Sequence, residues 1–65
     1  GGFMKAIKLP RVREITSLSN ATIYRLIKQG AFPKQIKLSK RTVVWNMDEI
    51  DNWLQEKMDI REVGL

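Results

Sequence analysis

The chain has 65 residues, no cysteine, no histidine and a formal net charge of +5. This length allows one domain with a small hydrophobic core. The absence of cysteine excludes disulfides and Cys-ligated zinc, and the absence of histidine removes the commonest general base and metal ligand. No apolar run approaches the roughly 18 residues of a membrane span. The composition therefore predicts a cytoplasmic protein with no cofactor, membrane partner or small-molecule substrate.

The charge is divided unequally along the chain. Residues 1–45 carry ten Lys or Arg against one acid, Glu14, whereas residues 46–65 carry two against six acids. A basic body with an acidic end favours one surface for a polyanion and another turned away from it, although a solvated basic surface is the alternative. Residues 1–3, before Met4, read as an expression remnant. We therefore expect one functional domain over 4–65, with an ordered core over about 9–58.

Two short helices are expected first. Pro10 suits the start of the first helix, which has an apolar stripe of Leu9, Val12 and Ile15. The second helix is predicted over about 20–29, with Ser19 or Asn20 as its N-cap and Gly30 in the left-handed position after its end. Its buried face comprises Ile23, Leu26 and Ile27, and Leu18 is a buried contact of the preceding turn.

A hairpin and a third helix follow. Apolar and polar residues alternate over 35–38, and 42–45 is β-branched and aromatic, which predicts two strands joined by a basic turn at 39–41. Asn46 caps a third helix over about 47–58, with Glu49 in a capping-box relation. The tail from 59 onward is expected to fray. Core positions are assigned to Phe32, Trp45 and Trp53.

This order predicts a mostly α fold with a small β-hairpin, a winged helix-turn-helix of three helices and a two-stranded antiparallel wing. The second helix would enter the major groove of DNA, and the wing over about 35–45 would lie on the backbone or minor groove. The candidate DNA-binding residues are Ser19, Asn20, Thr22, Tyr24, Arg25 and Lys28 on the helix, and Lys37, Lys40 and Arg41 on the wing.

The roles of these candidates follow from their chemistry. Arg25 can bind guanine or a phosphate, and Arg41 suits the minor groove. Asn20 and Thr22 can read base edges or cap the helix, and Ser19 is favoured as the cap. Tyr24 either holds a phosphate or closes the edge of the core. Lys28 suits a phosphate, and Lys37 and Lys40 suit the DNA backbone or minor groove, although a solvated hairpin tip is the alternative for the wing cations. Arg11 and Arg13 either clamp phosphate or face solvent.

Three other classes of function are less well supported. An enzyme lacks a candidate site, because helix capping explains the carboxylates at 48–51 and no histidine can activate Ser17 or Ser19. An RNA binder would expose aromatic side chains on a sheet, whereas these aromatics fall on inward stripes. A protein-binding adaptor would expose apolar residues on the second helix, whose outer face is instead polar and basic.

The ordered motifs resemble the AlpA family of small phage and prophage regulators, in the MerR-like winged-helix group that includes excisionases. The resembling segments are 18–25, 30–34, 36–38, Arg41 with Trp45, and 49–53; Ser39-Lys40 replaces a glycine common in the family's hairpin turn. The resemblance implies sequence-specific binding to double-stranded DNA. It also implies regulation of prophage or genomic-island genes or, alternatively, an excisionase-type directionality role. The small size favours repeated sites with neighbouring copies in contact.

Overall fold

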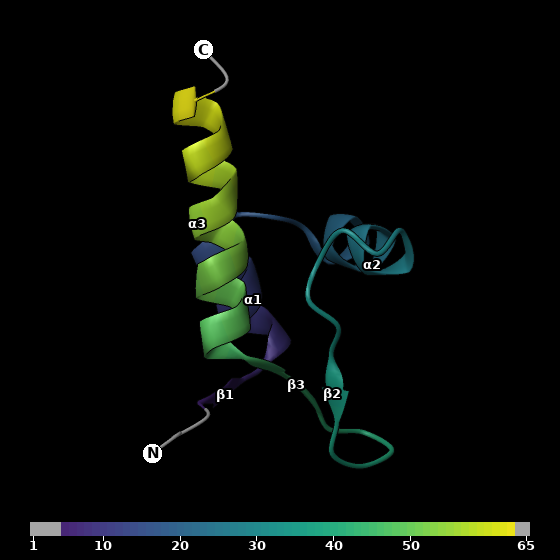
Figure 1. Cartoon of the computed structure of the whole chain (residues 1–65). Helices are drawn as coiled ribbons and strands as arrows, with labels where there is room; N and C mark the ends of the chain where they lie inside the picture. The colour runs from purple at the N-terminus through teal and green to yellow at the C-terminus, as the bar shows by residue number, and fades with distance from the viewer. Residues whose placement is uncertain (1–4, 64–65) are drawn as a thin grey trace.

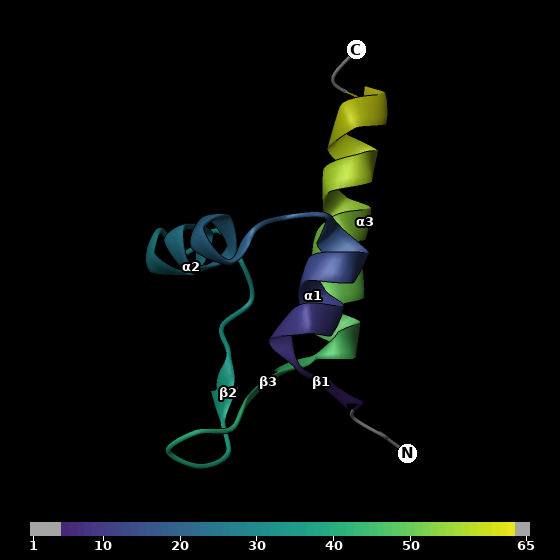
Figure 2. The same cartoon turned by 180° about the vertical axis from the view of Figure 1, so that it is seen from behind.

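The computed structural model describes residues 5–63, and the side chains of residues 5–60 (Figure 1). Its elements are β1 (Ala6–Ile7), α1 (Leu9–Thr16), α2 (Asn20–Lys28), β2 (Ile36–Lys37), β3 (Val43–Asn46) and α3 (Met47–Val63). In both Figure 1 and Figure 2, α2 and the β2–β3 hairpin lie on the same side of α3. Three helices with a small antiparallel sheet confirm the winged helix-turn-helix expected from the sequence.

The sheet has three strands in the order β1-β3-β2. The antiparallel β2–β3 hairpin confirms the expected two-stranded wing, and β1 is a third strand that the sequence did not indicate. Ile7 of β1 lies opposite Trp45 of β3, and Ile36 of β2 lies opposite Val44 of β3. The backbone N–H of Met47 extends the β1 side by donating to the carbonyl of Lys5 at 2.9 Å. A two-residue strand is too short to show a hydrophobic period, which explains why the sequence did not indicate β1.

The helix-turn-helix is held by local hydrogen bonds at its turn. Pro10 lies in the first turn of α1, as expected from its missing N–H. Ser17 ends α1 in the left-handed conformation, with φ 60°, and its N–H donates to the carbonyl of Arg13 at 2.7 Å. Leu18 is half-buried and packs against the core, so it contacts the core as predicted but is not fully enclosed.

Both ends of α2 agree with the sequence. The Ser19 hydroxyl accepts a hydrogen bond from the N–H of Thr22 at 3.2 Å, which satisfies a donor at the start of the helix. Gly30 adopts φ +74°, and the next N–H, from Ala31, donates to the carbonyl of Leu26 at 2.8 Å. The chain can therefore leave α2 in the left-handed conformation that glycine adopts without steric cost.

The third helix is longer than predicted. Asn46 caps it as expected, because its side-chain oxygen accepts from the N–H of Asp48 at 2.8 Å and of Glu49 at 3.3 Å. The helix then continues to Val63, beyond its predicted end near residue 58. Its second half contains good helix formers, and Gln55 donates to Asp59 one turn later at 3.0 Å. Helix propensity therefore extends α3 beyond its apolar stripe.

The core is formed where the sheet meets the three helices. Its buried members are Ile7, Val12, Ile23, Phe32, Trp45 and Ile50. Trp45 is completely buried, and its indole N–H donates to the carbonyl of Pro33 at 3.2 Å, so its polar atom is satisfied. Trp53 is half-buried and donates to the carbonyl of Ala31 at 2.7 Å, so it packs at the edge of the core. Across residues 5–63, no helix has the length and apolar character of a membrane span.

Candidate nucleic-acid interface

The buried apolar residues of α2 determine which of its side chains face outward. Ile23 is fully buried, and Leu26 and Ile27 pack against the core, one and two residues away from Arg25. Because an α-helix turns 100° per residue, Arg25 and Lys28 then point away from the core, and both side chains are exposed. The structure therefore presents two cationic side chains on the helix face that the sequence assigned to DNA.

At the start of α2, two side chains form the helix cap and a third is exposed. The Ser19 hydroxyl accepts from the Thr22 N–H and also donates to the Thr22 hydroxyl at 3.0 Å. Both hydroxyls are therefore engaged within the cap. Asn20, the first residue of the helix, is exposed. The capping alternative thus describes Ser19 and Thr22, whereas Asn20 keeps its amide at the surface.

Tyr24 lies between the outer face of α2 and the core. Its side chain is 41% exposed, yet its ring stands edge-on to Trp45, with centroids 6.3 Å apart and an interplanar angle of 62°. This aromatic contact braces the ring from one side. Tyr24 therefore closes the edge of the core, as one of the two expected roles requires, while part of the residue stays accessible.

The hairpin presents the second group of cations. Lys37, Lys40 and Arg41 are all exposed. The hairpin is closed by the N–H groups of Leu38 and Ser39, which donate to the carbonyl of Thr42 at 2.8 and 3.3 Å. None of residues 39–41 has a positive φ, so this turn does not need the glycine that is common in the family.

The Ser39 side chain stabilises this turn. Its hydroxyl accepts a hydrogen bond from the N–H of Arg41 at 3.4 Å, across the turn itself. Hydroxyl-to-backbone bonds of this kind are typical of serine in turns. The hairpin therefore holds Lys40 and Arg41 at its tip without special backbone geometry.

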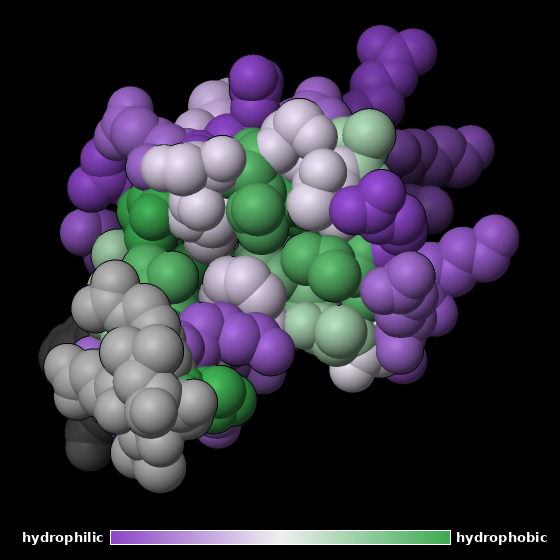
Figure 3. Space-filling view, turned by 90° about the horizontal axis from the view of Figure 1, so that it is seen from above, coloured by the Kyte–Doolittle hydropathy of each residue, from purple (hydrophilic) through white to green (hydrophobic). Residues whose placement is uncertain are grey.

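The two cationic groups lie on one side of the molecule. Figure 1 shows α2 and the hairpin together on the side away from α3, and the reverse view agrees (Figure 2). Seen from above, long hydrophilic side chains project from the side on which α2 lies, whereas the middle of that view is largely hydrophobic (Figure 3). The acidic residues 48–59 belong to α3. The charge division along the sequence is thus also a division between elements.

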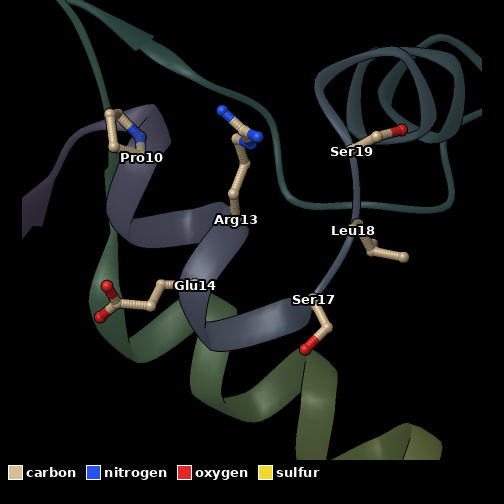
Figure 4. A pocket seen from close by; sticks show the side chains of 6 residues that line it. All are labelled: Pro10, Arg13, Glu14, Ser17, Leu18 and Ser19. Carbon is tan, nitrogen blue, oxygen red and sulfur yellow. The ribbon is translucent and has the colours of Figure 1, made fainter.

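The cations of α1 differ in their surroundings. Arg11 forms an ion pair with Glu14, whereas Arg13 has no carboxylate within ion-pair distance among the side chains described. Arg13 lines a shallow depression beside the turn that enters α2, on the same side as Ser19, and Glu14 points away from both (Figure 4). Arg11 is therefore engaged by a carboxylate of its own helix, and Arg13 is the α1 cation that lies beside the turn into α2.

Within residues 5–63, no three Asp or Glu side chains are grouped so as to hold a metal ion. The carboxylates at the start of α3 instead lie where the positive end of the helix dipole favours them.

Residues 5–58 match the family described as "Prophage CP4-57 regulatory protein (AlpA)". The chain belongs to the AlpA family. It is 34% identical over 58 residues to the "Uncharacterized protein ORF88" of Enterobacteria phage P4, covering 89% of this chain and 66% of that protein. It is 32% identical over 60 residues to the "DNA-binding transcriptional activator AlpA" of Escherichia coli (strain K12), covering 83% of this chain and 86% of that protein.

Family membership confirms the resemblance that the motifs indicated. The matched region includes α1, α2, the hairpin and the first part of α3. AlpA proteins are regulatory proteins and not enzymes, in agreement with the expectation from the sequence. The chain spans just under two thirds of the length of the phage P4 protein.

Proposed function

We propose that this AlpA-family protein is a sequence-specific DNA-binding regulator of prophage or genomic-island genes. The observation that carries the proposal is the pairing of an exposed polar and basic face on α2 with an exposed basic hairpin on the same side of the molecule. A helix for the major groove beside a hairpin for the flanking backbone is a recurring way to read duplex DNA. The name of the Escherichia coli relative, a transcriptional activator, supports activation as the regulatory outcome.

Each cation has a proposed target. The Arg25 guanidinium donates two hydrogen bonds, to O6 and N7 of a guanine, and the exposed Asn20 contacts a neighbouring base edge. Lys28 and Arg13 bind phosphates, as do Lys37 and Lys40 on the hairpin, which fixes the register of the protein on the duplex. Arg41 enters the minor groove, whose negative potential attracts guanidinium groups. Ser19 and Thr22 act by capping α2. Tyr24 positions α2 against β3, and its hydroxyl lies near the DNA backbone.

The protein would act where bacterial DNA lies, in the cytoplasm. A single domain of this size contacts few base pairs, so we propose binding to repeated sites on which neighbouring copies touch. The regulatory outcome depends on where those sites lie relative to a promoter or to the ends of a mobile element.

Binding selection from a pool of random duplexes tests the proposal. The purified chain is expected to enrich one short motif, and an Arg25→Ala variant carried through the same selection is expected to enrich a more degenerate motif. Retention of DNA with no enriched motif would mean that the basic surface of α2 and the hairpin binds polyanions without sequence preference. A failure to retain DNA even at low salt would favour the protein-binding adaptor.

A further inference from the structure

The hairpin carries one large apolar side chain that is mostly exposed. Leu38 directly follows β2 and is 62% exposed. Because Ile36 lies opposite Val44 and Lys37 opposite Val43, Leu38 belongs to the same strand face as Ile36 and Val44. Val43 and Trp45 belong to the other face, which packs in the core, and Leu38 is not among the residues packed there.

The backbone of Leu38 is fixed by the hairpin. Its N–H donates to the carbonyl of Thr42 at 2.8 Å, which places the residue directly beside the turn. The neighbouring exposed side chains are cations: Lys37 precedes it, and Lys40 and Arg41 follow across the turn. The hairpin tip therefore combines one apolar side chain with positive charge on both sides of it in sequence.

This combination fits the minor groove of DNA. The rims of the groove are lined by phosphates, and its interior offers sugar and base edges against which an apolar side chain can pack. Leucine is among the side chains that proteins insert between base steps, which partially unstacks them and kinks the duplex. An anionic lipid surface also attracts cations with apolar groups, but a single leucine offers little apolar area for a bilayer interface.

We propose that Leu38 is an apolar wedge that enters the minor groove and bends the DNA at the position of the hairpin. Lys37 and Lys40 hold the phosphates of the rims, Arg41 enters the groove, and Leu38 contacts a base step beside it. This inference rests on the proposed DNA-binding function and adds a specificity that needs no hydrogen bond to a base. The protein would prefer flexible pyrimidine–purine steps under the hairpin, because these cost the least energy to unstack.

The test compares Leu38→Ser with Ile60→Ser, because Ile60 on α3 is also 62% exposed but does not lie on the hairpin. The DNA is a selected duplex with a fluorophore at each end and 2-aminopurine at the step beneath the hairpin. Energy transfer reports bending, 2-aminopurine fluorescence reports unstacking, and anisotropy reports affinity. Circular dichroism checks that each variant is folded.

The wild type and Ile60→Ser are expected to bend the duplex and brighten 2-aminopurine equally. Leu38→Ser should lose most of both signals even at saturating protein, with about a tenfold loss of affinity from the lost apolar contact. Lys40→Ala should weaken binding but bend the duplex as fully as the wild type does at saturating protein. Equal bending by Leu38→Ser and the wild type would overturn the proposal.

Failure of the proposed function gives a different result. If selection enriches no motif, a mixed-sequence duplex at low salt replaces the selected one, since the wedge needs no base-specific contact. Bending that depends on Leu38 would then support the wedge while sequence-specific regulation fails. Leu38-dependent binding to phosphatidylserine–phosphatidylcholine vesicles without any DNA bending would overturn the wedge in favour of a membrane contact.

Discussion

At the residue scale, the side chains of α2 divide into those that hold the helix and those that are available to a ligand. The Ser19 hydroxyl donates to the Thr22 hydroxyl and accepts from the Thr22 N–H, whereas Arg25 is exposed on the outer face. This division follows from position. A side chain at the helix start meets unsatisfied N–H groups, and one a full turn later does not.

Arg25→Ala is expected to reduce discrimination between the selected duplex and a scrambled one by about 1–3 kcal/mol, because a bidentate guanine contact is lost. Competition titrations with both duplexes measure this difference. The matched variant is Lys40→Ala, since Lys40 is an exposed hairpin cation assigned to a phosphate. It should weaken binding to both duplexes alike and lower the salt slope by about 1. Equal losses on both duplexes from Arg25→Ala would remove its base-reading role.

Ser19→Ala is expected to lower the free energy of unfolding by about 1 kcal/mol, because the Thr22 N–H loses its acceptor. Urea denaturation measures this change. Ser19→Thr keeps the hydroxyl and should retain most of the stability. If both variants unfold at the wild-type urea concentration, the cap does not contribute to stability.

The sequence allowed the outward positions of Arg25 and Lys28 to be predicted, because a 3.6-residue period with three apolar residues defines both faces of a helix. It did not allow the exposure of Leu38 to be predicted. Strand alternation divides residues between two faces, but only the tertiary arrangement decides which face the helices cover. The part of the candidate site on α2 could therefore be predicted from the sequence, whereas the prediction for the hairpin was incomplete.

At the element scale, the residues that cap the helices could be predicted from the sequence, whereas strand β1 and the length of α3 could not. Ser19, Gly30 and Asn46 act within a few residues of themselves, so local sequence determines them. β1 depends on pairing with β3 across most of the chain, and two residues carry no local signal for it. The C-terminal half of α3 depends on helix propensity, which a search for apolar stripes does not detect.

Gly30→Ala is expected to destabilise the fold by about 1 kcal/mol, because a Cβ at φ +74° is strained. No heavy atom lies within 4 Å of the position that a Cβ would occupy, so the cost comes from the backbone and not from a clash. Thermal unfolding measures it, with Gly30→Asn as the control, since asparagine tolerates this conformation better than alanine. Equal stability of Gly30→Ala and the wild type would contradict the left-handed end of α2.

At the scale of the whole molecule, the separation of charge orients the protein on DNA. The cations of α2 and the hairpin lie on one side, and α3 carries the acidic residues of the second half. A polyanion would attract the first surface and repel the second, which limits the ways in which the protein can approach a duplex. Nonspecific binding should therefore already use the same face as specific binding.

Salt should weaken binding in proportion to the phosphates contacted. If four cations bind phosphates, the logarithm of the binding constant should fall with the logarithm of salt concentration with a slope of about −3.6. Neutralising acidic residues on α3, as in Glu56→Gln, should leave this slope unchanged, because Glu56 is exposed on the element away from the proposed DNA face. Titrations at several salt concentrations measure both slopes, and a changed slope together with tighter binding for Glu56→Gln would place α3 at the interface.

Sequence-specific recognition by α2 is tested by fluorescence anisotropy with the selected duplex and a scrambled duplex of equal length and composition. We expect tighter binding to the selected duplex at every salt concentration, with the largest ratio near physiological salt, where phosphate contacts alone are weak. The ratio should fall for Arg25→Ala and persist for Lys40→Ala. Equal binding of the wild type to both duplexes at every salt concentration would contradict sequence-specific recognition by α2.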